Sequence, residues 1–137
     1  MRTVRSAGPV LLAVLCLAGG LACSSKPPEE PVGPGPSDDL LEAAGLLRDY
    51  TIENKRGPAR LSEAQKFEPL YSRAYHGIQQ GNLVVVWNVP MPLEGGAAAV
   101  IAYEKQAPSE GGFVLLQNGE IKQMSPADFT STPKAKR

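Results

Sequence analysis

The segment from residue 24 to residue 37 most limits what this chain can fold into. It reads SSKPPEEPVGPGPS, with five prolines, two glycines and one aliphatic residue. This composition cannot supply a hydrophobic core, and proline-rich segments favour the extended polyproline II conformation. We therefore expect residues 23–37 to form a tether and residues 38–130 to form the folded part. A stretch of that length builds one small core, so one domain is expected.

The residues before the tether have the order of charge and hydropathy found in an export signal. Met1, Arg2 and Arg5 precede an apolar run at residues 9–18, and a small-residue stretch then leads to Cys23. The uncharged run is shorter than the roughly 20 residues that span a bilayer, which argues against an uncleaved transmembrane helix. Residues 1–22 are therefore predicted to be a signal peptide that the mature protein lacks.

The end of this signal resembles those of bacterial lipoproteins that the lipoprotein signal peptidase processes. Ala22-Cys23 matches the core of their motif, and Gly20 stands where leucine is more usual, so the match is to the permissive form. The resemblance implies that the Cys23 thiol carries a diacylglyceryl group and that its amine receives a further acyl chain. Several acyl chains anchor a protein firmly, whereas one binds only marginally. The alternative is an ordinary secretory signal cut before Cys23.

The same resemblance implies a place in the cell envelope. Ser24 follows the cysteine, and this favours the outer membrane, facing the periplasm, over the inner-membrane retention that an Asp there would favour. The expected partners are the membrane, through the N-terminal lipid, and an envelope protein or polymer. Without Arg2 and Arg5, 12 of the 14 basic side chains remain against 14 acidic ones, so no nucleic-acid binding is expected.

Both cysteines are accounted for by this interpretation. Cys16 lies in the part removed and Cys23 would be acylated, which leaves no thiol for a disulfide, a metal site or a nucleophile. We therefore expect the fold to be held by packing, without a cofactor.

The first half of the folded part predicts helices. Ser37 suits an N-cap and Gly57-Pro58 a stop, with apolar or small residues at helical spacing between them. These are Leu40, Ala43, Ala44, Leu47 and Tyr50. A capping-box pattern at Ser62 and Gln65 predicts a second, short helix, and residues 70–80 predict a third.

The second half predicts strands, at residues 83–89, 97–104, 113–117 and 120–124. Asn118-Gly119 joins the last two and fits a type I′ hairpin turn, in which both central residues have positive φ. Short connections favour an antiparallel meander in chain order, with the helices covering one face, which makes the fold class α+β. A capped turn at Ser125-Pro126 should return Phe129 to the core. We expect residues 131–137, with Lys134, Lys136 and Arg137, to be a disordered basic tail.

The strand region carries a second resemblance. The runs VVVWNVP, VIAYEKQAP and GGFVLLQNGEIKQMSPADF are similar to the C-terminal part of small uncharacterised lipoproteins and pilin-like proteins of planctomycete-type bacteria. In these a strand ending near a Tyr-Glu pair precedes a hairpin with Asp-Gly or Asn-Gly; Tyr103-Glu104 and Asn118-Gly119 match. The chain lacks the cleavage site and the long apolar helix of a pilin. The resemblance brings no activity with it.

No catalytic or metal-binding constellation stands out in the sequence. His76 is the only histidine, and we interpret Glu104, Glu110 and Glu120 as solvated residues at strand ends. An envelope hydrolase would gain support if Tyr103, Glu104 and His76 met in one pocket.

Aromatic residues are the better indication of binding. Tyr71, Tyr75, Trp87 and Tyr103 are predicted to line one surface groove, although Trp87 and Tyr103 also suit the core. We therefore expect a lipid-anchored envelope protein that acts as a non-enzymatic binding or assembly module. The alternative is an accessory, pseudopilin-like component of a secretion or pilus-type machine.

Overall fold

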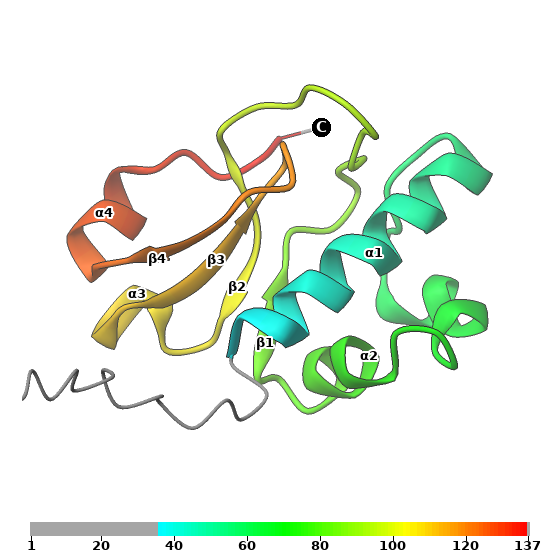
Figure 1. Ribbon diagram of the computed structural model, residues 1–137, viewed down its shortest axis with the longest axis horizontal. Helices are drawn as coiled ribbons and strands as arrows, with labels where there is room; N and C mark the ends of the chain where they lie inside the picture. The colour runs from blue at the N-terminus through cyan, green and yellow to red at the C-terminus, as the bar shows by residue number, and fades with distance from the viewer. Residues whose placement is uncertain (1–35, 137) are drawn as a thin grey trace, which may run out of the picture. The chain divides into compact units, whose positions relative to one another are not determined.

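Helices pack against a four-stranded antiparallel sheet in the computed structural model, which describes residues 36–136 (Figure 1). The expected α+β class is therefore confirmed. The predicted signal peptide, Cys23 and nearly all of the predicted tether lie outside the described residues. Among the residues that are described, no helix combines the length and apolar character needed to cross a membrane.

Helix α1 spans Pro36–Asn54 and buries the apolar residues predicted for it. Leu40, Ala43 and Leu47 are at most 1 % exposed, because their spacing puts them on one face of the helix. The helix ends two residues before the expected position. Lys55 adopts the left-handed conformation with φ 57°, and its N–H donates to the Thr51 carbonyl at 2.8 Å, which closes the last turn.

Two shorter helices follow, the 3₁₀ helix η1 at Leu61–Phe67 and the α-helix α2 at Ser72–Gln79. The predicted capping box does not form, because η1 begins before Ser62, after an extended Arg60. Glu63 lies in the first turn instead, where its Oε2 accepts from the Tyr50 hydroxyl at 2.7 Å. This hydrogen bond joins η1 to α1.

The sheet consists of β1 (Leu83–Val85), β2 (Val100–Glu104), β3 (Gly112–Leu116) and β4 (Ile121–Met124), in that spatial order. Every neighbouring pair is antiparallel, as expected for a meander. β1 is shorter than predicted because Asn88 adopts φ 64° and turns the chain, and its N–H donates to the Pro58 carbonyl at 2.8 Å. Val89 and Met91 then enter the core.

A bulge in β2 determines which residues face each side of the sheet. Val100 pairs with Leu116 and Ala102 with Leu115, so Ile101 is an extra residue on this strand. Ile101 and Ala102 consequently both join the core beneath α1, while Val100 joins a second cluster with Leu116. Both faces of β2 are thus buried.

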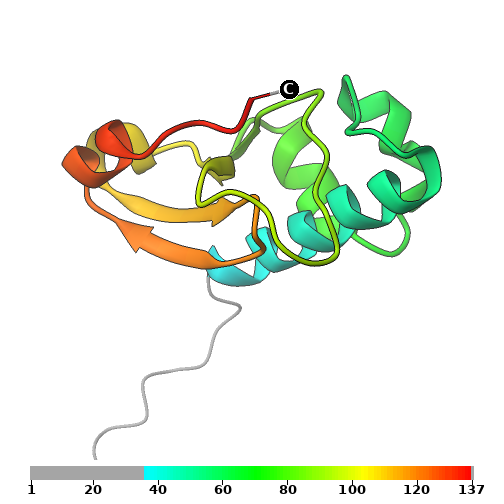
Figure 2. The same ribbon diagram turned by 90° about the horizontal axis from the view of Figure 1, so that it is seen from above.

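The second cluster is covered by α3 (Ala107–Glu110) and α4 (Pro126–Ser131), which contribute Ala107 and Phe129 to it. The expectation that the helices cover one face was therefore wrong; Figure 2 shows α4 on the opposite side of the sheet from α1. Ser125 caps α4 as predicted, because its Oγ accepts from the Asp128 N–H at 3.2 Å. Phe129 is thereby returned to the core, with 6 % exposure.

The structure also corrects the expected disordered tail at residues 131–137, since the chain is ordered through Lys136. Lys134 pairs with Val100 in a parallel bridge, and Ala135 is buried. The Val100 N–H donates to the Pro133 carbonyl and the Ala135 N–H donates to the Val100 carbonyl, both at 2.9 Å. These two hydrogen bonds hold the segment against β2, and Ala135 joins the core beneath α1.

The Asn118-Gly119 hairpin between β3 and β4 is confirmed, but its turn is not type I′. Gly119 has φ 89°, whereas Asn118 is not among the residues with positive φ. The Gly119 N–H donates to the Leu116 carbonyl at 2.9 Å, and the Leu116 N–H donates to the Glu120 carbonyl at 2.8 Å. This is the three-residue hairpin loop that ends in a left-handed glycine.

Candidate functional site

The four aromatic residues predicted to form a groove lie against two different clusters. Tyr71, Tyr75 and Trp87 are partly buried against the core beneath α1. Tyr103 packs in the second cluster, where its ring lies 4.8 Å from that of Phe129. The sheet separates these clusters, so Tyr103 does not share a groove with the other three.

Tyr71 has a structural explanation of its own. Its hydroxyl donates to Asp49 Oδ2 at 2.6 Å, and this hydrogen bond, with burial, raises the pKa of the phenol. Its ring lies against Gly45, where a Cβ would come within 2.4 Å of the ring. The glycine in α1 therefore makes room for the tyrosine, and the pair joins the start of α2 to α1.

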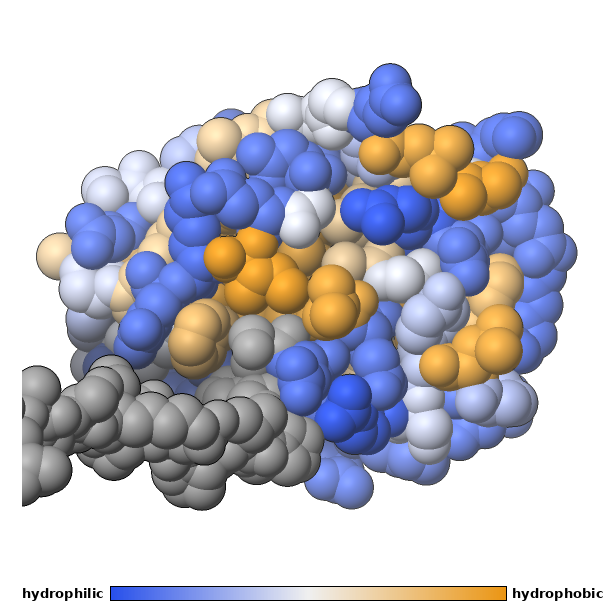
Figure 3. Space-filling model, in the orientation of Figure 1, coloured by the Kyte–Doolittle hydropathy of each residue, from blue (hydrophilic) through white to orange (hydrophobic). Residues whose placement is uncertain are grey.

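Exposed hydrophobic side chains do not form one large patch on the face drawn in Figure 3, where they occur in separate groups divided by hydrophilic residues. Leu41, Ile52, Leu70 and Leu93 are the large hydrophobic residues most exposed in the described part of the chain. Scattered exposure of this kind is common in soluble domains and does not by itself indicate an interface.

A cluster of charges joins the beginning of α1 to α2. Arg73 Nε lies 2.8 Å from Glu42 Oε1 and 3.8 Å from Asp39, and Arg73 Nη1 lies 4.0 Å from Asp38. Glu42 Oε2 also accepts the Arg73 and Ala74 N–H groups, at 3.0 and 3.3 Å. These are first-turn amides of α2, so a side chain of α1 caps another helix.

The pKa of Glu42 reflects this arrangement. Burial raises it, but the hydrogen bonds and the charge of Arg73, together with the two amides, outweigh burial and hold the pKa below its usual value. The cluster is thus explained by the packing of α2 on α1.

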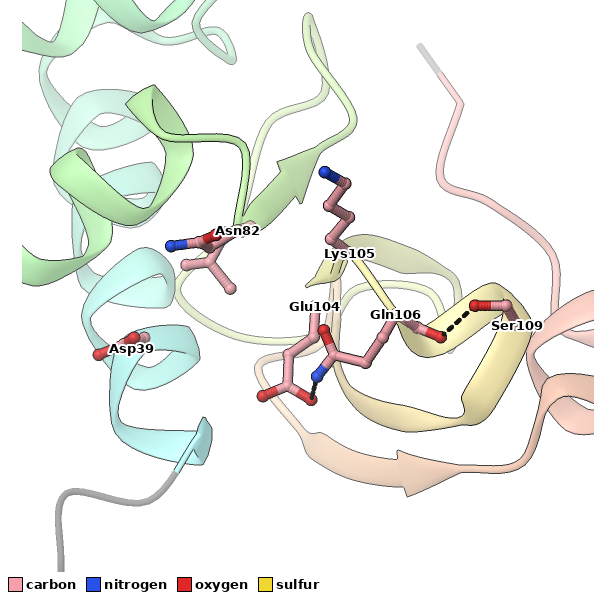
Figure 4. Close-up of a pocket in the computed structure, with 7 residues that line it drawn as sticks. Asp39, Asn82, Glu104, Lys105, Gln106 and Ser109 are labelled. Carbon is pink, nitrogen blue, oxygen red and sulfur yellow. Dashed lines mark hydrogen bonds between the residues drawn. The ribbon is translucent and has the colours of Figure 1, made fainter.

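A cavity of about 450 Å³ opens beside this cluster, between the start of α1, the turn before β1 and the connection from β2 to α3 (Figure 4). Its lining comes from three separate segments of the chain: Asp39, Asn82, Leu83, Glu104, Lys105, Gln106 and Ser109. Leu83 and Glu104 are buried, whereas Asn82, Lys105, Gln106 and Ser109 are exposed. The cavity therefore has two buried lining residues and a polar rim.

Glu104 is the one charged residue classed as buried in the described chain, with 7 % exposure. Its Oε2 accepts the Phe113 N–H at 2.8 Å and the Gln106 Nε2 at 3.1 Å. A Cβ at Gly112 would come within 2.7 Å of this oxygen. The absence of a side chain at Gly112 therefore allows the carboxyl group to reach the start of β3.

The other oxygen of Glu104, Oε1, has no hydrogen-bond partner within residues 36–136, and no cation there lies within 4.0 Å of the carboxyl group. Figure 4 shows this oxygen on the side of the cavity nearer α1, where Asp39 lies, and shows Lys105 directed away from it. The fold uses one oxygen of Glu104 and leaves the second one free for a donor.

Sequence reasoning placed Glu104 at a solvated strand end, and that interpretation was wrong. The residue ends a strand, but the β2–α3 connection folds over it and removes it from solvent. The sequence signal that could have shown this is Gly111-Gly112. A glycine pair usually indicates a turn, but Gly112 here also provides space for the carboxyl group.

The other candidate acids and His76 lie elsewhere. His76 is exposed on α2, where Nε2 lies 3.2 Å from Glu68 and Nδ1 lies 3.3 Å from Gln79. Glu110 lines a second cavity, of about 420 Å³, at the junction of α3, β3 and α4. Neither cavity brings Tyr103, Glu104 and His76 together. Within the described residues, no three His, Cys, Asp or Glu side chains are grouped so as to hold a metal ion.

Comparison with known proteins gives no relative from which a function could be transferred. No protein-family model, no curated protein and no solved structure matches this chain.

Proposed function

We propose that this protein is a lipid-anchored protein of the cell envelope whose α+β domain acts as a non-enzymatic binding or assembly module. The observation that carries the proposal is the order of the first 37 residues: a basic start, an apolar run, small residues, Cys23 and then a proline-rich segment. An acylated Cys23 would hold the chain at the membrane, and the segment behind it would separate the domain from the lipid surface.

The domain contributes the binding part of this proposal. Its first cavity has a size usual for sites that hold small molecules and is lined from three segments of the chain. One of its buried side chains, Glu104, has an oxygen that the fold does not use.

Anchoring is tested by expressing the full chain in a bacterium and measuring the intact mass of the membrane-extracted protein. We expect a chain that begins at Cys23 and carries a diacylglyceryl group, with or without a further acyl chain. Cys23→Ser should abolish this product. Cys16→Ser is the matched control, because it removes the only other cysteine and should leave acylation intact. An unprocessed or unacylated N-terminus in the parent protein would refute the anchor.

An accessory role in a secretion or pilus-type machine is the second candidate. The observation that favours it is the resemblance of the strand region to pilin-like proteins, which Tyr103-Glu104 and Asn118-Gly119 carry. Crosslinking in intact cells, followed by mass spectrometry, separates the two. Secretion subunits crosslinked to the parent protein and lost with Cys23→Ser would favour the machine component.

A further inference from the structure

We propose that the cavity beside Glu104 binds the protonated primary amine of a polar ligand, with Glu104 Oε1 as the main acceptor. The inference rests on the proposed function, in which the domain is a binding module, and gives that module a ligand class. The first step is the state of Glu104. A buried carboxyl group is normally satisfied by several donors or by a cation, because removal from water is otherwise costly.

Only one oxygen of Glu104 is satisfied by the fold. Oε2 accepts from Phe113 and Gln106, which holds the start of β3 and the β2–α3 connection in place. Oε1 has no donor within residues 36–136, but it is not among the unpartnered side-chain atoms there that are removed from solvent, so it opens to the cavity. A donor from a ligand can therefore reach this oxygen and replace water there.

The charges around the cavity favour a cation as this donor. Asp39 is a second carboxylate in the lining, and its nearest basic group, Arg73 Nε, is 3.8 Å away and is already held by Glu42 at 2.8 Å. Lys105 is the only basic residue in the lining, and Figure 4 shows its side chain directed away from Glu104. A cationic ligand group at Glu104 Oε1 would therefore share the cavity with a second acid and would not meet the lysine.

The size and the neutral groups of the cavity favour an ammonium on a polar body. Asn82, Gln106 and Ser109 offer amides and a hydroxyl at the rim, and Leu83 gives a small apolar surface. A cavity of about 450 Å³ admits a molecule the size of a monosaccharide or an amino acid. The same chemistry is carried by a free amino compound and by a lysine side chain of another protein, so the test includes a probe for each.

The test is a titration of the purified, ¹⁵N-labelled full chain, recorded as amide chemical-shift changes by NMR. The probes are glucosamine, for a free amine, and Nα-acetyl-lysine amide, for a lysine side chain. In their N-acetylated counterparts, N-acetylglucosamine and Nα,Nε-diacetyl-lysine amide, the charged amine is replaced by a neutral and larger amide while the rest of the molecule is unchanged. We expect saturable shifts at the amides of Asn82, Lys105 and Gln106 with an amine probe and none with its acetylated counterpart. The probe that binds more tightly indicates the source of the amine.

Glu104→Gln removes the charge and keeps the size of the side chain and one acceptor oxygen, so it should weaken binding at least about tenfold. Glu110→Gln is the matched control, because that acid is exposed at the end of α3 and lies outside this cavity. Amide shifts far from the cavity report whether Glu104→Gln still folds. If it does not, Asp39→Asn replaces it and should weaken binding severalfold.

Three results would overturn the proposal: no shift at these amides with either amine, equal shifts with the acetylated counterparts, or unchanged affinity in the variants. These results are independent of acylation at Cys23, because binding is measured on purified protein. If the protein is acylated at Cys23 but binds no amine, only the amine-binding proposal is refuted. If the chain is not acylated but still binds amines, only the proposed lipid anchor is refuted.

Discussion

Glu42 is a side chain of α1 that caps α2, and replacing it should show how much one residue contributes to joining the two helices. Glu42→Ala removes two acceptor contacts with first-turn amides of α2 and the ion pair with Arg73. It leaves the apolar faces of both helices unchanged, so the loss should come from the polar contacts alone.

The expected magnitude follows from the two kinds of contact. Loss of a helix cap costs about 1 kcal/mol, and a partly exposed ion pair contributes about 0.2–1 kcal/mol. The Glu42 side chain is 24 % exposed, so solvent screens the pair only in part. We expect the free energy of unfolding to fall by about 1–2 kcal/mol, and Tm to fall by about 4–8 °C for each kcal/mol in a domain of this size.

The assay is urea unfolding followed by circular dichroism, with Glu53→Ala as the matched control. Glu53 lies on the same helix and pairs with Lys66, but both side chains are about half exposed and Glu53 caps nothing. Both substitutions gain the same small helix propensity of alanine. The control should lose less than about 0.5 kcal/mol. A third variant, Arg73→Ala, removes the ion pair and keeps the cap, so it should fall between the other two.

Equal losses of unfolding free energy for Glu42→Ala and Glu53→Ala would refute the reasoning, because the cap that only Glu42 provides would then contribute nothing. A loss for Arg73→Ala as large as that for Glu42→Ala would also refute it, since the ion pair alone would then account for the effect.

Four further predictions test other contacts. Because the pKa of Glu42 is lowered in the folded state, its carboxylate stabilises the fold above the usual pKa of 4.5, and this contribution is lost as the pH falls toward the lower value. In urea titrations the stability difference between the parent protein and Glu42→Ala should therefore shrink below about pH 4.5. A constant difference would contradict this. Gly112→Ala should displace the Glu104 carboxyl group and cost about 1–3 kcal/mol by calorimetry, whereas no loss would mean that the connection moves aside easily. Gly119→Ala forces alanine to φ 89° beside Arg48 and should cost about 1–2 kcal/mol in urea unfolding; a neutral result would contradict the left-handed turn. A stop codon after Ser131 removes two backbone hydrogen bonds to Val100, so it should cost about 1–3 kcal/mol and speed hydrogen exchange at the Val100 amide, while a frayed tail would change neither.

The elements that the sequence predicted well are those set by short-range patterns. The apolar spacing of α1 is one example, since residues three and four apart share a helix face whatever lies opposite them. The Asn118-Gly119 hairpin is another, because a turn signal between two apolar runs brings neighbours in sequence together. The detailed turn type was missed because Asn-Gly also suits the loop in which glycine alone is left-handed.

The features that the sequence did not predict depend on residues far apart in the chain. Glu104 is buried only because Gly112 and the β2–α3 connection close around it. The last residues are mostly polar and basic, and nothing local marks Ala135 as buried; its position is set by the backbone pairing of this segment with Val100. Likewise, the cap of α2 comes from Glu42, which is 30 residues away from the start of the helix. Local capping patterns cannot reveal such a partner.

The pairing of Val100 with the segment at residues 133–135 has a consequence for the order in which this domain folds. Pro133 and Ala135 follow Val100 by 33 and 35 residues, whereas β2, β3 and β4 are neighbours both in sequence and in the sheet. Closing a longer loop costs more conformational entropy, so the three strands should pair before the last segment joins them. Refolding of this domain should therefore end with the segment closing on β2.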